Sequence, residues 1–154
     1  MKILLTGDFF YNYDHTVDDY IKIINEISKY DRIFMNYEGS FWGNQKLKKS
    51  VTLSMTDASL NLPNNISLIL CNNHITDFGP NGIKNTIEKI KSKKIDFFGL
   101  NKNISDTSYF NNYHIKDKNI FIATLGWTNE ECVAAKQKTP GIKPFNSSSI
   151  NELK

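Results

Sequence analysis

Arginine is nearly absent from this sequence, because Arg32 is the only arginine among the 19 basic residues. Arginine supplies the bidentate contacts with which specific nucleic-acid-binding proteins hold phosphates and base edges. The lysines are scattered along the chain, and the net charge of +3 favours solubility. The composition therefore predicts that the chain binds no nucleic acid.

Paired cysteines, long apolar runs and a secretory signal are also lacking. Cys71 and Cys132 lie far apart, without the spacing of zinc ribbons or redox motifs, which predicts reduced thiols. No run approaches the roughly 20 apolar residues of a membrane span. The N-terminus, MKILLTGDFF, has neither a long apolar region nor a small-residue cleavage site. We therefore expect a cytoplasmic protein with no membrane span or anchor.

The size and composition are those of one globular domain. The chain has 154 residues, of which 40% are hydrophobic and 23% charged, and a chain of this length buries roughly 70% of its unfolded surface. Residues 130–154 differ from the rest, because they contain two prolines and a serine run and show no strong period. We therefore predict one domain over residues 1–154, which we expect to be partial, with a loop-rich tail over 130–154.

Short strand-like runs alternate with amphipathic segments along the chain. Runs with the pattern of strands occupy residues 2–6, 32–36, 50–55 (the weakest), 67–71, 95–100 and 119–127. Helical periodicity is found over residues 16–30, where Thr16 and Asp19 resemble a capping box, and over residues 79–94. This order predicts an α/β fold with a mostly parallel sheet flanked by helices.

Polar side chains follow the first three strong strands. Asp8 follows the first, Asn36 and Glu38 follow the second, and the third continues into CNNH, from Cys71 to His74. In open α/β sheets, binding groups collect at the carboxyl ends of parallel strands. Carboxylate, amide and imidazole groups together suit Mn, Fe or Zn. A pair of such metals can generate hydroxide and clamp the oxygens of a phosphate ester.

Each of these residues, taken alone, has a simpler structural explanation. Asp8 is suited to cap a turn, Glu38 to be a solvated loop acid, and His74 to be a hydrogen-bonded structural histidine. The amides and the aspartate of NNHITDFG are equally typical of a turn that leads into a helix. Only their occurrence together at successive strand ends favours a functional site.

A family resemblance is carried by TGD, NYEGS, NNHITDFGPNGIKNT, FFGLNKN and IFIATLGW, in this order and at these spacings. The chain resembles the N-terminal half of the poly-γ-glutamate capsule biosynthesis proteins, a branch of the calcineurin-like metallophosphoesterases, over about residues 1–130. The resemblance implies the first half of a four-layer α/β/β/α sandwich. It also implies a metal-dependent phosphoesterase-like hydrolase in capsule or cell-envelope polymer biosynthesis.

The same resemblance assigns roles to individual residues. It implies that Asp8, Glu38 and Asn73 ligate one or two divalent metals, with Glu38 in the bridging position. It implies that His74 is the catalytic histidine that faces the phosphate, and an imidazole beside a metal pair can protonate a departing oxygen. An anionic or phosphorylated ligand is the expected partner.

Two further residues are predicted to bind substrate. Asn36 stands close behind the bridging acid, and Asn72 precedes the proposed amide ligand, where we expect it mainly to shape the loop. The aspartate-x-histidine pair of the wider superfamily is absent, because Phe9 and Phe10 follow Asp8. This capsule branch usually lacks that histidine too.

The histidine content is a larger departure from the family pattern. Relatives carry further metal-ligating histidines in a C-terminal half, whereas this chain has only His15, His74 and His114. His114 is expected at the surface, and His15 is a weak candidate for contact with substrate or metal. The predicted site is therefore half a site.

Three functions are compatible with the sequence. The chain is either the N-terminal portion of a longer metallophosphoesterase, or an inactive relative that binds a phosphorylated or polyanionic ligand, or a structural partner of another subunit. The missing ligands then come from a missing C-terminal half or from a protein partner.

Overall fold

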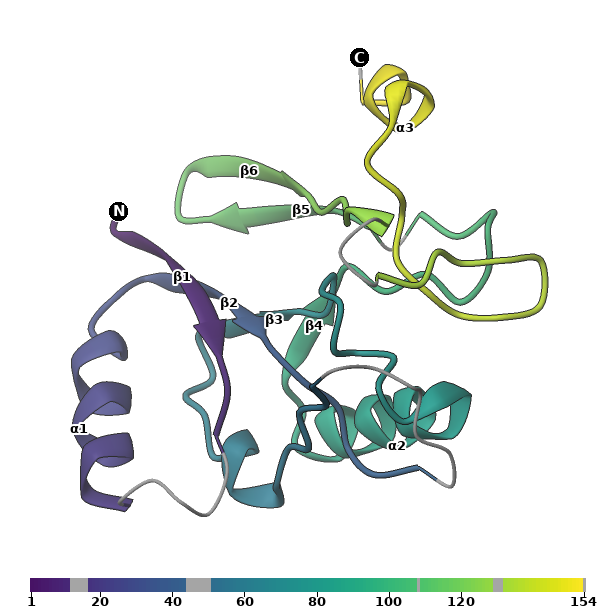
Figure 1. Cartoon of the computed structure of the whole chain (residues 1–154). Coiled ribbons are helices and arrows are strands. Elements are labelled where there is room, and N and C mark those ends of the chain that lie inside the picture. Colours follow the sequence, from purple (N-terminus) through teal and green to yellow (C-terminus); the bar gives the residue numbers. More distant parts are fainter. Residues whose placement is uncertain (12–16, 44–50, 108, 129–131, 154) are drawn as a thin grey trace.

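The computed structural model describes residues 1–11, 17–43, 51–107, 109–128 and 132–153 (Figure 1). The elements in chain order are β1 (Ile3–Phe9), α1 (Val17–Ile27), β2 (Arg32–Tyr37), the 3-10 helix η1 (Asp57–Leu60), β3 (Ile66–Ile69), α2 (Gly79–Ser92), β4 (Asp96–Phe98), β5 (Phe110–Ile115), β6 (Lys118–Ala123) and α3 (Ser147–Asn151). Strands β1 to β4 form a parallel sheet in the order β1-β2-β3-β4. The prediction of an α/β fold with a mostly parallel sheet and flanking helices is confirmed.

The two faces of the sheet are covered by different elements. Side chains alternate between the faces along a strand, so Met35 of β2 lies on the face of α1, where it lines a cavity with Ile23 and Ile27. Phe34 lies on the opposite face, and its ring is 4.9 Å from that of Tyr113 in β5. Figure 1 shows the same arrangement, with α1 and α2 on one side of the sheet and the β5–β6 hairpin on the other.

Helix α2 begins and ends close to the predicted bounds. Pro80 occupies the first turn, where its missing N–H group leaves no hydrogen bond unmade. Ile83 and Ile90 are buried in the core, with relative exposures of 3% and 0%. Helix α1 also forms within its predicted range, whereas the capping-box residue Thr16 lies outside the described residues.

The predicted strand over residues 50–55 is wrong for its described part, because residues 51–55 form only an isolated bridge between Ser54 and Ser40. The Met55 N–H donates to the Ser40 carbonyl, but the Leu53 N–H donates to the side chain of Asp77. The carboxylate of Asp77 therefore accepts the hydrogen bond that the Leu53 N–H group would otherwise donate to a neighbouring strand.

The last predicted strand, residues 119–127, corresponds to β6, which lies outside the parallel sheet. It pairs antiparallel with β5, a strand that the sequence did not predict. The hairpin is held on the sheet by Arg32, whose guanidinium lies 4.9 Å from the centroid of the Tyr113 ring and 2.6 Å from Asp96 Oδ2. Burial raises the pKa of Tyr113 to about 12.

The described part of the tail consists of isolated bridges and the short helix α3. Ile142 is completely buried, and the backbone of Gly141 exchanges two hydrogen bonds with Asn101. The segment therefore returns to the core.

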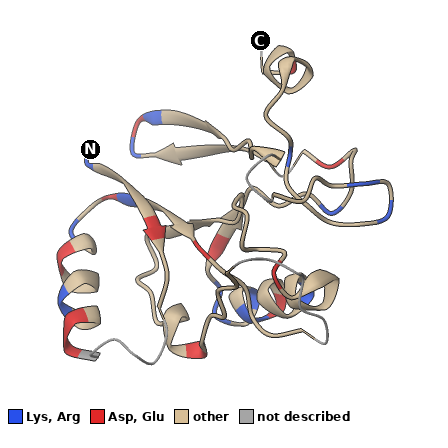
Figure 2. Ribbon diagram, in the orientation of Figure 1, with Lys and Arg blue, Asp and Glu red and all other residues tan. Residues whose placement is uncertain are grey.

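Among the described residues, no helix is long and apolar enough to cross a membrane. Figure 2 shows the Lys and Arg positions spread over α1, α2, the turn between β5 and β6 and the C-terminal segment.

Candidate functional site

Two carboxylates meet at the carboxyl end of β1 and β2. Asp8 is opposite Asn36 in the parallel register of these strands, and Glu38 follows β2 directly. The Asn36 Nδ2 group donates to Asp8 Oδ1 at 2.6 Å and to Glu38 Oε2 at 2.8 Å. The structure thus brings Asp8 and Glu38 to one edge of the sheet, as their positions after the strands predicted, with an amide N–H group between them.

His74 reaches the same cluster from the loop after β3. Its Nε2 atom is 3.9 Å from Glu38 Oε1, and both side chains are only 12% exposed. Its Nδ1 atom is 2.8 Å from Asp77 Oδ2. The imidazole therefore lies between the cluster of Asp8 and Glu38 and a third carboxylate, that of Asp77, which is fully buried.

Asn72 builds the turn that presents His74. Its Oδ1 atom accepts from the backbone N–H groups of His74 and Ile75 at 3.0 and 2.9 Å. Its Nδ2 group donates to the Tyr37 carbonyl at 2.8 Å and to Asn36 Oδ1 at 3.3 Å. Asn72 is 6% exposed, so the structure shows the loop-shaping contacts, and substrate binding by Asn72 stays a prediction.

The remaining predicted site residues are placed as follows. Asn73 is half-buried in the same turn. His114 is exposed, as predicted, and its Nδ1 atom lies 3.0 Å from Asn119 Oδ1 across the hairpin. His15 lies outside the described residues.

Asp77 was missed as a functional residue and was interpreted only as part of a helix start. It is completely buried and contacts His74, three positions before it in the chain. Residues three apart in a tight turn lie on the same side of it, so the spacing was the available signal. The side-chain contact itself depends on how the turn packs.

The electrostatics of the site favour the neutral form of Glu38. Burial raises the pKa of Glu38 above its usual value, and the negative charge of Asp8 raises it further. His74 and the hydrogen bond from Asn36 act in the opposite direction. Burial and the neighbouring carboxylate of Asp8 together therefore outweigh the two favourable contacts of Glu38.

A pH dependence of stability follows from Glu38. Because its folded pKa is raised above 4.5, the folded state holds this proton more tightly than the unfolded chain. The contribution is fully present below pH 4.5 and is lost as the pH rises through the raised folded pKa. We expect Glu38→Gln to have a higher urea midpoint than wild type at pH 8 in EDTA, and a flatter decline above pH 4.5.

The matched control for this measurement is Glu88→Gln, which removes a carboxylate that is 61% exposed on α2. It should leave the decline of the urea midpoint unchanged. If Glu38→Gln lost stability with rising pH as steeply as wild type does, Glu38 would not be the group responsible.

The donor set at this edge is incomplete for a metal. In the described ranges, no three His, Cys, Asp or Glu side chains form a group suited to hold a metal ion. The two carboxylates provide oxygen atoms of the kind that bind a divalent cation. At present the amide of Asn36 supplies the partial positive charge between the carboxylates. The residues therefore fit part of a divalent metal site.

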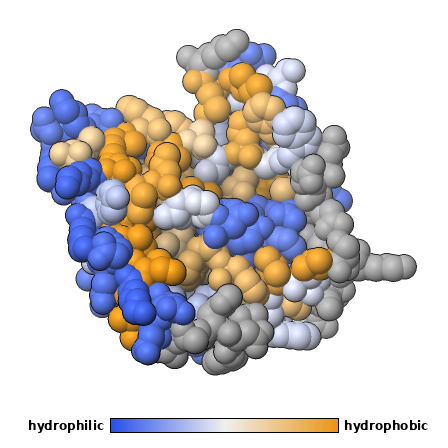
Figure 3. Space-filling model, turned by 60° about the vertical axis from the view of Figure 1, so that its left-hand side comes forward, coloured by the Kyte–Doolittle hydropathy of each residue, from blue (hydrophilic) through white to orange (hydrophobic). Residues whose placement is uncertain are grey.

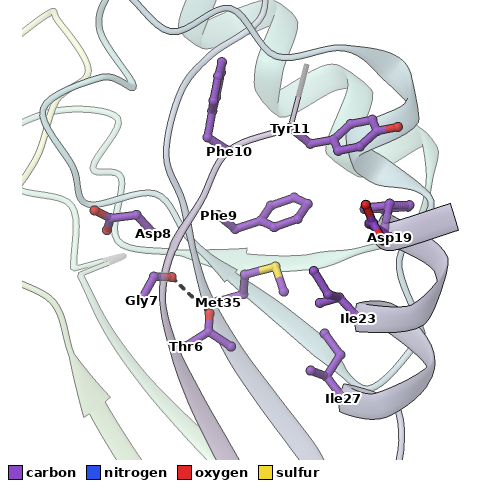
Figure 4. A pocket seen from close by; sticks show the side chains of 11 residues that line it. Thr6, Gly7, Asp8, Phe9, Phe10, Tyr11, Asp19, Ile23, Ile27 and Met35 are labelled. Atoms are coloured by element: carbon purple, nitrogen blue, oxygen red, sulfur yellow. Dashed lines mark hydrogen bonds between the residues drawn. The ribbon is translucent and has the colours of Figure 1, made fainter. Parts of the chain in front are cut away.

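A cavity of about 360 Å³ lies beside this edge, between β1 and α1 (Figure 4). Its walls are mainly apolar and include Phe9, Ile23 and Ile27. In Figure 4 the carboxylate of Asp8 points away from these apolar side chains. The cavity and the carboxylate cluster are thus separated by strand β1.

Comparison with known proteins gives a consistent result. The family model described as bacterial capsule synthesis protein PGA_cap matches residues 3–153. The PGA biosynthesis protein CapA of Bacillus subtilis (strain 168) is 36% identical over 75 residues, which are 47% of this chain and 20% of that protein. The capsule biosynthesis protein CapA of Bacillus anthracis is 32% identical over 108 residues, which are 66% of this chain and 26% of that protein.

The aligned region thus spans only a fifth to a quarter of these relatives. The family match nevertheless covers nearly the whole chain and confirms the resemblance seen in its strand-end motifs. The chain belongs to the PGA_cap family of bacterial capsule synthesis proteins.

Proposed function

We propose that this chain provides part of the active site of a metal-dependent, phosphoesterase-like hydrolase that acts in capsule or cell-envelope polymer biosynthesis. One observation carries the proposal: Asp8, Glu38 and His74 come from the carboxyl ends of three neighbouring parallel strands, Asp8 and Glu38 share the amide of Asn36, and His74 Nε2 lies 3.9 Å from Glu38 Oε1. A lone structural acid or histidine does not require this convergence. The site faces an anionic or phosphorylated ligand.

The proposed metal ligands are Asp8, Glu38 and Asn73, for one or two ions of Mn, Fe or Zn. Such an ion, when bound, polarises a phosphoryl oxygen and lowers the pKa of water. With the carboxylates engaged by a metal, the Asn36 Nδ2 group, which now donates to Asp8 and Glu38, would be available to donate to the substrate. His74 is the residue that protonates the departing oxygen, because its Nε2 atom faces the carboxylate cluster.

Further ligands come from outside the described residues, either from a C-terminal portion or from a protein partner. Two features support this part of the proposal. Strand β1 is at the edge of the described sheet, and Leu5 on it is 68% exposed. Figure 3 shows apolar surface on the side that carries β1 and α1. An edge strand can pair with a further strand, and exposed apolar side chains can be covered by a further segment or subunit.

The functional test is hydrolysis of a generic phosphodiester and a generic phosphomonoester by a longer chain or a complex in which the metal site is complete. We expect turnover that depends on added Mn²⁺ and is abolished by EDTA, once the missing ligands are supplied by a longer chain or by a partner. Metal-independent turnover, or none with the site complete, would contradict the proposal.

Metal binding by this chain alone is expected to be weak. A site that has about half of its ligands forfeits several kcal/mol of binding free energy. Elemental analysis after dialysis should therefore find less than one Mn, Fe or Zn ion per chain, whereas a longer relative dialysed beside it should retain more. Retention of two ions by the monomeric chain would show that the ligands were wrongly identified.

A second candidate function is an accessory subunit that binds an anionic polymer or a phosphorylated ligand without turnover. It is favoured by the lack of a complete metal-binding group among the described residues. Ligand affinity that does not change with EDTA would select this function.

We also propose a cytoplasmic location, supported by the described thiols Cys71 and Cys132, which form no disulfide.

A further inference from the structure

A second hollow of about 560 Å³ lies beside the loops that follow β1 and β2. We call it the Trp42 groove. Its lining includes one exposed aromatic ring, three hydroxyl groups and an ion pair, supplied by Trp42, Thr52, Ser54, Thr56, Asp57 and Lys89. Sites for small molecules are concave and combine apolar rings with a few polar groups. The Trp42 groove has this composition.

The Trp42 groove adjoins the candidate site along two strands. Ser40, two residues after Glu38, forms a parallel bridge with Ser54 in the groove wall. Phe10, two residues after Asp8, lies in the same wall. A molecule held in the groove can therefore extend toward the edge of the sheet where the two carboxylates meet.

Trp42 is held in place and is nevertheless exposed. Its ring stacks on that of Phe78, with centroids 4.7 Å apart and 26° between the planes. Its carbonyl accepts a hydrogen bond from Asn85 Nδ2 at 2.6 Å. Trp42 is still 63% exposed, whereas Phe78 is 1% exposed. Binding to a side chain that is already fixed costs little conformational entropy.

An indole ring that is covered on one face is suited to stack on a sugar with the other. The face of an aromatic ring is electron-rich, and it attracts the C–H groups that line one face of a pyranose ring. The hydroxyl groups of Thr52 and Ser54 can both donate and accept hydrogen bonds. They therefore match the hydroxyl groups at the rim of such a sugar.

The charges of the groove disfavour a polyanion. Among its described lining residues the charged ones are Lys89 and Asp57, which pair with each other. The Lys89 Nζ atom also lies 4.9 Å from the centroid of the Phe41 ring. A polyanion would have to separate this ion pair and would approach Asp8 and Glu38, and like charges brought together are repelled. An uncharged molecule meets neither cost.

We propose that the Trp42 groove binds an uncharged sugar unit, which stacks on the indole of Trp42 and forms hydrogen bonds with Thr52 and Ser54. Binding in the groove is a property of this chain, and only its use as a substrate subsite rests on the proposed function. In that use the substrate is a phosphoester of a glycan. Its phosphate lies at the carboxylate edge and a neighbouring sugar lies in the groove.

The test uses the intrinsic fluorescence of the chain, which has two tryptophans, Trp42 and Trp127. Trp127→Phe leaves Trp42 as the single emitter. This variant is titrated in EDTA with maltotetraose, with N-acetylchitotetraose and with tetra-γ-glutamate as an anion of equal length. We expect a saturable change in Trp42 emission with a neutral tetrasaccharide that is the same at low and high salt, and none with the peptide.

The outcomes that would overturn the proposal need no variant of the groove. One is the lack of a saturable change with both neutral tetrasaccharides. The other is saturation by tetra-γ-glutamate at an equal or lower concentration, which would select an anionic occupant. In the reverse variant, Trp42→Phe, the emission of Trp127 should not respond to the sugar.

Affinities measured by calorimetry locate the contact. Trp42→Ala should weaken sugar binding by about tenfold, the scale of one aromatic contact, and Trp42→Phe should restore most of it. Trp127→Ala is the matched control, because Trp127 is 57% exposed and stacks on Phe145 with centroids 5.4 Å apart, outside the groove. It should leave the affinity unchanged. Equal losses in folded Trp42→Ala and Trp127→Ala would overturn the proposal.

Where turnover is measurable, Trp42→Ala should raise the KM for a glycan phosphodiester with little change in kcat, because the groove does not contact the reacting atoms. If the sugar binds at Trp42 but no phosphoester is hydrolysed with the metal site complete, the groove stands and the proposed hydrolase function fails. The two results are therefore separable.

Discussion

Replacing His74 by alanine is expected to lower turnover by about a hundredfold or more, the usual scale for removal of a general acid. Its Nε2 atom is directed at Glu38, and its Nδ1 atom, on the other side of the ring, contacts Asp77 Oδ2. Bound metal should be largely retained, because the proposed ligands are the two carboxylates and Asn73. The measurement is Mn²⁺-supplemented hydrolysis with the metal site complete, with metal content determined on the same samples.

Asp8→Ala is the comparison variant, and it should lose metal and activity together because it removes an anionic ligand. This pairing separates a catalytic residue from a metal ligand. Equal activity in wild type and Asp8→Ala would mean that the activity is a contaminant or that the site is elsewhere. A binding protein would instead show affinity losses in both variants, with no turnover to lose.

Phe34→Ala is expected to destabilise the fold by about 3–5 kcal/mol, the usual range for truncating a buried aromatic residue. Phe34 has 0% exposure and joins the sheet to the hairpin. Its ring lies 6.2 Å from Phe98 in an edge arrangement and 4.9 Å from Tyr113. Since a domain is stable by only about 5–15 kcal/mol, the urea midpoint should fall by a large fraction.

Leu5→Ala is the matched control, because Leu5 is opposite Phe34 in the register of β1 and β2 but is 68% exposed. It should change the free energy of unfolding by no more than about 0.5 kcal/mol, as for most surface substitutions. Equal losses in the two variants would show that the hairpin does not bury Phe34.

The parallel sheet and the meeting of Asp8 and Glu38 at one edge of it were predictable from local patterns. Apolar runs such as SLIL, alternating with helical periodicity, predicted the strands and their parallel order. Polar residues directly after those runs predicted that Asp8 and Glu38 meet. These predictions hold because the carboxyl ends of parallel strands lie on the same edge whatever the details of packing.

The hairpin was not predictable in the same way. Strand β5, FNNYHI, is rich in asparagine, which is disfavoured in strands. It forms because Tyr113 packs on Phe34 and under Arg32, residues that are distant in the sequence. The segment over 51–55 shows the reverse case, since its local pattern resembles a strand but its Leu53 N–H is taken by Asp77.

The chemical environment of each site residue was decided by the tertiary structure alone. The sequence by itself determined which polar groups follow which strands, because that depends only on strand periodicity. It did not determine that the amide of Asn36 lies between two carboxylates, or that Asp77 holds His74 from the side opposite Glu38. Those contacts depend on side-chain directions and burial, which are fixed only when distant segments pack together.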